Sequence, residues 1–304
     1  MTIKRRIFIS SPRDEHLDDL RNELKWAIVD EIEKLGYEAQ VFGSADGGKG
    51  LAAGKSWIPD EANKVMRRCV GAAILGFPIW KGIEIMNKEN EVPLVSEYCH
   101  YEGALARAYR LPILSVLEQG LKERVFFVRY GGDIPVRPPA QIGKEWVSGD
   151  EFQNYLEKWD ERIRKRKDVF LAYSSGSVET AQYIKGVLTK LGVSTLDWKS
   201  DFVGGPTILD QINEAVNQTS GGVFLFTRDD MLMGAEELAA PRDNVVFEAG
   251  IFANSKGYER VLIVLEEGAK LPADLGGIVY VPMADKRNLV SIEPQMKRFI
   301  DNVL

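Results

Sequence analysis

The residue with the clearest capacity for catalysis is a glutamate in the second half of the chain. Glu248 lies within residues 245–253, whose spacing of apolar side chains predicts a helix that follows a strand. A carboxylate on the first turns of such a helix can stabilise the positive charge that develops on a sugar ring when its glycosidic bond breaks. Glu248 is therefore the candidate catalytic residue. Taken alone, it is also compatible with a half-buried acid in a salt bridge.

Polar and aromatic side chains follow the predicted strands of the same half. Small residues let backbone N–H groups approach a phosphate, and aromatic rings can stack on a base. The candidate ligand-binding residues at these strand ends are Tyr173, Ser174, Ser175, Ser177, Trp198, Phe202, Asp229 and Asp230. Each type has a structural alternative, because serines cap helices, a tryptophan packs in a core, and paired aspartates form a turn.

Alternating strands and helices are expected to bring these residues to one edge of a sheet. In the first half, the pattern predicts strands at 6–10, 37–42, 70–77, 112–117 and 124–129, and helices at 15–35, 58–69 and 96–109. In the second half, it predicts strands at 169–173, 194–198, 222–227 and 260–265, and helices at 178–191, 208–217 and 245–253. The fold class is therefore α/β, with parallel sheets covered by helices on both faces. Ligands bind at the carboxyl ends of the strands in such sheets.

The two halves of the chain resemble each other. Residues 100–120 align with 246–268, which places Glu102 opposite Glu248, and residues 58–77 align with 208–227. A length of 304 residues suits two domains of this kind. We expect an N-terminal domain at 1–149, a charged linker helix at 150–167 and a C-terminal domain at 168–304.

Composition narrows the function classes. The net charge is −6, so no overall basic field favours nucleic acid or anionic lipid. Two cysteines and two histidines offer neither a disulfide framework nor a histidine-rich metal site, and no metal is expected. No apolar run reaches the length of a membrane span, and the N-terminal apolar stretch is too short for a signal peptide. We expect a cytoplasmic protein without a membrane partner. The glycine-rich stretch at 43–54 lacks the GK[ST] ending of a P-loop.

The second half resembles the TIR-like nucleotide-binding domain of bacterial antiphage effectors, including TIR domains fused to STING in CBASS systems. The resemblance rests on VFLAYSS (169–175), DWKSDFVGGPTILDQI (197–212), FLFTRDD (224–230), PRDNVVFEAGIFANSKGYERVLIVLEEG (241–268) and LPADLGGI (271–278). It implies a flavodoxin-like sheet, with Glu248 as the family's catalytic glutamate and Arg242 and Asn244 among the nucleotide-binding residues. Ala249 stands where relatives often have leucine, and this departure is not expected to disturb catalysis.

The resemblance implies an NAD glycohydrolase. The enzyme would cleave the bond between nicotinamide and ribose, with NAD as substrate and with no cofactor. It would act in antiphage defence, depend on self-association into a homo-oligomer, and operate with a partner protein of its defence system. Two alternatives stay open: a synthase of a cyclic ADP-ribose signal or a deoxyribosyltransferase-like enzyme, and a non-enzymatic scaffold or nucleotide sensor.

The first half resembles the same superfamily more loosely, and also the nucleoside deoxyribosyltransferase-like fold. The points of contact are IFISSPRDE (7–15) and YEGALARA (101–108). It lacks RDN before the glutamate and carries an insertion at 80–93. A second candidate site would comprise Ser10, Ser11, Arg13 and Glu102, although a degenerate sensor or assembly domain is the preferred interpretation.

Overall fold

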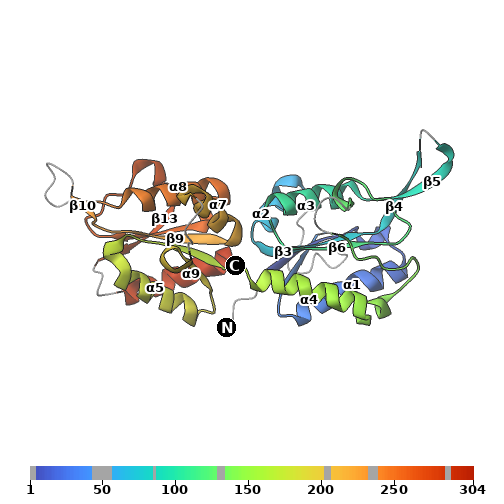
Figure 1. Cartoon of the computed structure of the whole chain (residues 1–304), viewed down its shortest axis with the longest axis horizontal. Coiled ribbons are helices and arrows are strands. Elements are labelled where there is room, and N and C mark those ends of the chain that lie inside the picture. Colours follow the sequence, from blue (N-terminus) through green and yellow to red (C-terminus); the bar gives the residue numbers. More distant parts are fainter. Residues whose placement is uncertain are drawn as a thin grey trace. The chain divides into compact units, whose positions relative to one another are not determined.

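The chain forms two compact units that divide between Lys165 and Arg166 (Figure 1). The computed structural model describes residues 5–42, 57–84, 87–128, 134–201, 207–231, 239–284 and 289–304. Each unit is built around its own parallel β-sheet with helices on both faces. The predicted α/β class is therefore confirmed.

The N-terminal sheet has the strand order β2-β1-β3-β6, with all neighbours parallel. Its strands are β1 (Arg6–Ser10), β2 (Glu38–Val41), β3 (Cys69–Gly76) and β6 (Ile113–Leu117). Every residue of β3 and β6 is buried, as expected for strands covered on both faces.

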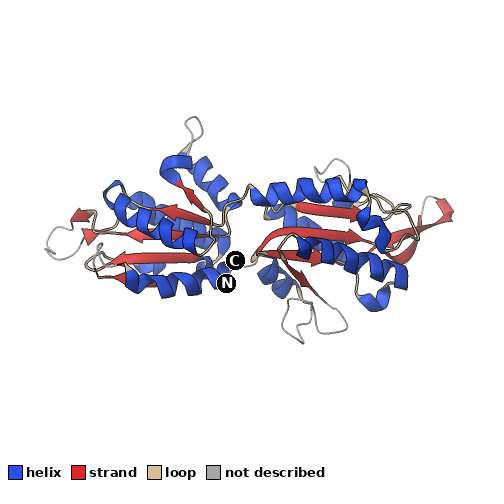
Figure 2. Ribbon diagram, turned by 90° about the horizontal axis from the view of Figure 1, so that it is seen from below, coloured by secondary structure: helices blue, strands red, loops and turns tan. Residues whose placement is uncertain are grey.

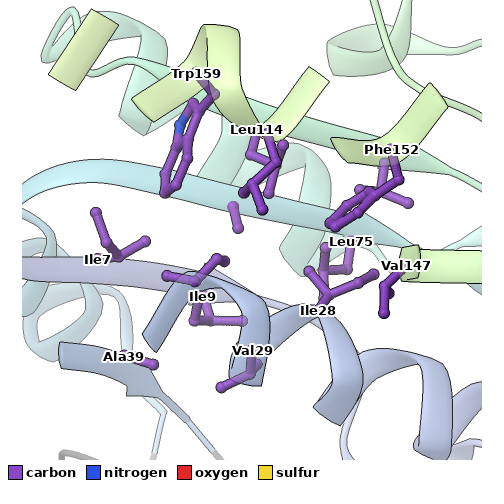
Figure 3. Close-up of a cluster of buried hydrophobic side chains, with 14 of the residues drawn as sticks. Ile7, Ile9, Ile28, Val29, Ala39, Leu75, Leu114, Val147, Phe152 and Trp159 are labelled. Carbon is purple, nitrogen blue, oxygen red and sulfur yellow. The ribbon is translucent and has the colours of Figure 1, made fainter. Parts of the chain in front are cut away.

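Two pairs of helices cover this sheet. Helices α1 (Asp19–Lys34) and α4 (Asp150–Arg164) pack on one face, and α2 (Pro59–Met66) and α3 (Glu97–Ala108) pack on the other. Figure 3 shows Trp159 and Phe152 of α4 approaching the strands in the same cluster as Ile28 and Val29 of α1. The indole Nε1 of Trp159 also donates a hydrogen bond to the carbonyl of Pro112 (3.0 Å). The charged helix is thus a packed layer of the N-terminal unit.

An antiparallel hairpin extends from the edge of the N-terminal unit (Figure 1). It consists of β4 (Pro78–Glu84) and β5 (Asn87–Val95). This is the insertion noted at 80–93, for which the sequence indicated no secondary structure. Trp80 pairs with Leu94 across the two strands.

The C-terminal sheet has the order β13-β12-β9-β7-β8, again with parallel neighbours. Figure 2 shows strands lying between helices in each unit. The strands are β7 (Val169–Ala172), β8 (Thr195–Asp197), β9 (Gly221–Phe226), β12 (Val261–Glu266) and β13 (Val279–Met283). Counted along the chain, this is the 2-1-3-4-5 order of flavodoxin-like sheets.

Helices again cover both faces of the C-terminal sheet. Helices α5 (Val178–Lys190) and α9 (Glu293–Val303) pack on one face, and α7 (Ile208–Gln218) and α8 (Asp243–Lys256) pack on the other. A short helix α6 (Trp198–Asp201) follows β8, and a small ribbon of β10 (Asp230–Met231) and β11 (Ala239–Ala240) precedes α8. The strand β13 and the helix α9 were not part of the sequence prediction.

The predicted strand at 124–129 is wrong where the structure describes it. Val125–Phe127 is a 3₁₀ turn in which Val125 has a φ of 46°. Phe126 and Phe127 are both buried in the same core cluster. Consecutive residues of a strand point to opposite faces, so a turn is required to bury both rings on one side.

Several other element boundaries also differ from the prediction, among them the following two. The strand predicted to include Trp198 ends at Asp197, and Trp198 begins α6. The first long helix begins at Asp19 instead of residue 15, because the Asp18 carboxylate accepts a hydrogen bond from the Arg21 amide (2.9 Å) and caps the helix there.

Candidate active site

Glu248 is positioned by the N-terminal end of α8. The helix begins at Asp243, with Arg242 as its N-cap, so Glu248 is its sixth residue. Val245 and Ala249 on the same helix are buried against the sheet, which fixes the helix on the strand ends. The Glu248 side chain is consequently largely buried, with 8% of the residue exposed.

A cavity of about 630 Å³ lies in front of this carboxylate. Its lining residues come from the ends of β7 and β8 and from the first turns of α7 and α8: Tyr173, Ser174, Ser175, Trp198, Lys199, Ile208, Gln211, Arg242, Asn244, Val245 and Glu248. This volume falls within the range of about 300–1,000 Å³ that small-molecule sites occupy. The cavity is large enough for a nucleotide.

Burial changes the acidity of Glu248. Desolvation raises the pKa of its carboxyl group from 4.5 to about 7. Within the part of the chain that the structure describes, no hydrogen-bond donor or cation is paired with this carboxylate. An acid that is buried, raised in pKa and open to a cavity is typical of a functional site.

Aromatic rings and a lysine form one wall of the cavity. The Tyr173 hydroxyl donates to Asp197 Oδ1 (2.9 Å), and Trp198 Nε1 donates to the Tyr173 carbonyl (3.0 Å). The Lys199 ammonium lies 5.5 Å from the centroids of both rings. Burial, together with the Asp197 carboxylate, raises the pKa of Tyr173, so its hydroxyl stays protonated. This wall offers flat apolar surface next to a positive charge.

A closed set of hydrogen bonds braces the loops beside the cavity. Asp229 accepts from the Ser174 hydroxyl (2.6 Å), the Thr227 hydroxyl (3.0 Å) and the Arg242 backbone amide (3.1 Å). Ser177 shares a hydrogen bond with Thr227 (2.7 Å) and another with Ser174 (3.1 Å). Asp229 therefore ties the end of β7, the end of β9 and the start of α8 together.

The structure brings most of the sequence-predicted residues to one cavity. Tyr173, Ser174, Ser175, Trp198, Arg242, Asn244 and Glu248 line it. Ser177 and Asp229 belong to the brace, and Asp230 pairs with the Arg242 guanidinium (3.3 Å). Phe202 lies outside the described residues.

Four further lining residues were missed from the sequence: Lys199, Ile208, Gln211 and Val245. Ile208 and Gln211 are three positions apart on the first turn of α7, and this spacing placed them on one helix face without showing which end of the sheet they reach.

The residues of the second candidate site lie at a smaller cavity in the N-terminal unit. Ser11, Arg13 and Glu102 line a space of about 140 Å³. Ser10 is buried beneath it, with 1% exposed.

Among the described residues, no three His, Cys, Asp or Glu side chains gather in a way that could hold a metal ion. No helix in the described ranges has the length and apolarity to cross a bilayer.

Similarity to known proteins agrees with this geometry. Residues 168–285 match the family model described as the TIR domain of the CAP12/Pycsar effector protein. The C-terminal unit contains a TIR domain of this family. The matched span holds every residue that lines the larger cavity.

Individual proteins are similar to part of this chain. The Pycsar effector protein BcPycTIR of Burkholderia cepacia is 29% identical over 181 residues, which cover 58% of this chain and 56% of that protein. The CD-NTase-associated protein 12 of Sphingobacterium faecium is 32% identical over 116 residues, covering 37% and 35%. The chain thus spans about a third to a little over half of the length of these relatives. Among solved structures, the TIR domain of the Toll-related receptor TRR-2 from Hydra magnipapillata aligns with a TM-score of 0.34 and 16% identity, over 44% of this chain and 98% of that one.

Proposed function

We propose that the TIR domain cleaves the bond between nicotinamide and ribose in NAD, with Glu248 as the catalytic residue. The observation that carries the proposal is the buried Glu248 carboxyl group, which has no described partner and faces a cavity of about 630 Å³. Nothing in the described protein uses this carboxylate, so it is available to a ligand.

The cavity walls suit the two ends of a dinucleotide. Trp198 offers a ring on which a base can stack, and Lys199 and Arg242 offer positive charge to a pyrophosphate. Ser174 and Ser175 follow β7 at the same edge of the sheet. The ribose that bears nicotinamide would then lie against Glu248.

The bond-breaking step requires Glu248 in its ionised form and not as a proton donor. As the bond between C1′ and the pyridinium nitrogen breaks, both electrons move to nitrogen, and nicotinamide leaves uncharged. The positive charge moves to the ribose ring as an oxocarbenium-like state, which the Glu248 carboxylate stabilises. Water then bonds to C1′ and releases a proton to solvent, which gives ADP-ribose.

We further propose that the domain acts as a defence effector that is activated when copies of the chain associate. Phe247, next to the catalytic residue, is 57% exposed, and Leu209 on the neighbouring helix α7 is 49% exposed. Apolar side chains on the outside of the two helices that frame the cavity would be covered in an assembly. A nucleotide signal and a partner protein of the defence system would control that assembly.

The test is incubation of the purified full chain with NAD over a range of protein concentrations. Chromatography would separate nicotinamide, ADP-ribose and any cyclic product, and so distinguish hydrolysis from cyclisation. We expect activity per molecule to rise with concentration and to disappear in Glu248→Gln. The matched control is Glu267→Gln, a change at an exposed glutamate of the same unit. Undiminished NAD loss in Glu248→Gln would overturn the proposal.

A further inference from the structure

The N-terminal unit has a cavity at the same place on its own sheet as the TIR domain has. Glu102 is the sixth residue of α3, just as Glu248 is the sixth residue of α8, and each helix follows the third strand of its sheet. The N-terminal cavity is lined by the loop after β1, by the start of α3 and by the β4 arm of the hairpin. The matched family model covers residues 168–285 and does not include this cavity, and the proposed reaction does not use it.

The carboxyl group of Glu102 forms the floor of this cavity. The residue is 4% exposed, and Trp57 Nε1 donates a hydrogen bond to its Oε1 (2.5 Å). Burial raises the pKa of this carboxyl group to about 7, although the Ser10 hydroxyl and the Trp57 indole act in the opposite direction. Burying a carboxylate is costly unless it is paired and hydrogen-bonded. The Ser10 hydroxyl and the Trp57 indole satisfy only part of its acceptor capacity.

Aromatic rings form the walls. Trp57 and Tyr98 meet edge to face, with ring centroids 4.4 Å apart, and Tyr98 is half exposed. Trp80 of the hairpin also lines the cavity and is 55% exposed. Large rings that remain open to solvent around a buried acid provide stacking surface for another flat molecule.

The size of the cavity limits the ligand to one ring system. Its volume is about 140 Å³, against about 630 Å³ in the TIR domain. An apolar cavity of about 150 Å³ in another protein accepts one benzene molecule, whereas drug-sized ligands need about 300 Å³ or more. A dinucleotide does not fit in this space.

The charges at the cavity limit the ligand further. Glu97 and Glu102 both line it. Arg13 at the rim lies 3.6 Å from Glu15, which offsets its positive charge. An anionic ring would meet the Glu102 carboxylate without compensation, whereas N–H groups would satisfy it.

We propose that this cavity binds a single heteroaromatic ring that carries N–H donors, with the ring against Trp57 and Trp80 and the donors on Glu102. Two sources have this chemistry: a free nucleobase, and the nicotinamide that the TIR domain would release. Only the second source rests on the proposed function, and in that case the N-terminal unit senses the product.

The test is calorimetric titration of the full chain with adenine, nicotinamide and nicotinic acid. Nicotinic acid has the ring of nicotinamide, with a carboxylate in place of the N–H donors, so it serves as the matched probe. We expect adenine or nicotinamide to saturate the protein, with a Kd of roughly 10 μM to 1 mM, and nicotinic acid to bind at least tenfold more weakly. Saturation by adenine alone assigns the site to nucleobases, and saturation by nicotinamide alone assigns it to the product ring.

Variants assign the binding to the N-terminal cavity. Glu102→Gln should weaken binding about tenfold, since a hydrogen bond to a charged group is lost. Trp80→Ala, a change at an exposed position of the hairpin, should weaken it several-fold without unfolding the chain. Glu157→Gln, an exposed change on α4, is the control and should bind as the native chain does.

Glu248→Gln should also bind the ring normally, so a failure of the proposed NAD chemistry and a failure of this site can be told apart. The proposal is overturned if neither adenine nor nicotinamide saturates the protein at about 10 mM. It is equally overturned if Glu102→Gln binds as tightly as the native chain, or if Glu248→Gln alone abolishes binding.

Discussion

The two units place a glutamate at the same position of the corresponding helix and surround it differently. Glu102 accepts a hydrogen bond from Trp57, whereas Glu248 has no partner among the described residues. Tyr98 is the second residue of α3 and so corresponds to Asn244, the second residue of α8. Its aromatic ring lines the N-terminal cavity and takes up space there. The same scaffold thus yields a small cavity with a partly satisfied acid in one unit and a nucleotide-sized cavity with a free acid in the other.

This difference indicates that the two glutamates have different roles, ligand binding for Glu102 and catalysis for Glu248. A carboxylate that already accepts a hydrogen bond from an indole N–H is held in place and has fewer acceptor sites left for a ligand. A desolvated carboxylate without a partner can stabilise positive charge that develops on a substrate. Burial raises both pKa values to about 7, so the pKa alone does not separate the two roles. The hydrogen-bond partners of the two carboxyl groups and the volumes of their cavities do separate the two roles.

The strongest test exchanges the two glutamates for glutamine separately. Glu248→Gln should lower kcat/KM for NAD by about 100- to 1,000-fold, because the group acts on charge in the transition state. Glu102→Gln should leave most of that activity in place. Release of nicotinamide, measured by chromatography in both variants, checks the prediction. Equal losses in both would show that the two units share one composite site.

The second test compares Asp229, which belongs to the brace, with the adjacent Asp230, which does not. Asp229→Ala leaves the Ser174 and Thr227 hydroxyls and the Arg242 amide without their acceptor, and should destabilise the C-terminal unit by about 2–3 kcal/mol. Asp230→Ala removes only an exposed ion pair with Arg242 and should change stability by less than about 1 kcal/mol.

Thermal unfolding of both aspartate variants checks this, with Tm expected to fall by about 5–10 °C in Asp229→Ala alone. If Tm stays constant in Asp229→Ala while KM for NAD rises, Asp229 binds the ligand directly, as its place after β9 first suggested.

The third test uses pH. Because burial raises the Glu248 pKa to about 7, the folded protein holds a proton that the unfolded chain releases above its ordinary value of 4.5. This group therefore favours folding at low pH, and its contribution is lost as pH rises through about 7. The chemistry needs the carboxylate, so kcat/KM should be about tenfold lower at pH 6 than on a plateau above pH 8.

Stability and activity should therefore run in opposite directions over this pH range. Relative to the native chain, Glu248→Gln should gain in Tm between pH 6 and pH 8, because glutamine has no charge to bury. A flat profile of kcat/KM between these pH values would contradict the role of Glu248 as an ionised group.

Much of the fold follows from the sequence, because parallel strands buried on both faces appear as short apolar runs between helix patterns. The sheet edge that collects the ligand-binding residues follows from the same topology. The β4–β5 hairpin was missed, since residues 87–95 carry charges and a proline instead of regular apolar alternation. Its Trp80 consequently could not be assigned to the N-terminal cavity.

The site was predicted less completely than the fold. Sequence position places Ser177 and Asp229 after strands, but it does not show whether their polar atoms face a ligand or each other. Gln211 reaches the cavity only because α7 packs beside α8, which is a tertiary arrangement. Glu248 was found from its place on a helix that follows a strand and from the family resemblance, and Glu102 was found because the two halves of the chain align.

The last and smallest expected effect concerns Trp198, for which the sequence left ligand binding and core packing as alternatives. The structure combines them: the residue is half buried, lines the cavity and donates from Nε1 to the Tyr173 carbonyl.

Trp198→Phe keeps an aromatic ring and removes the hydrogen-bond donor. The free energy of unfolding should fall by about 0.5–1.5 kcal/mol, with a slightly lower Tm, while KM for NAD rises less than about fivefold. Trp198→Ala also removes the stacking surface, worth about 1–3 kcal/mol, and should raise KM roughly tenfold with little change in kcat. Steady-state kinetics and thermal unfolding of the two variants distinguish the contribution of the aromatic ring from that of the Nε1 hydrogen bond. Truncation of a fully buried tryptophan lowers the free energy of unfolding by about 3–5 kcal/mol. If Trp198→Ala loses that much stability while KM for NAD is unchanged, the Trp198 ring packs in the core and the base binds elsewhere on the wall.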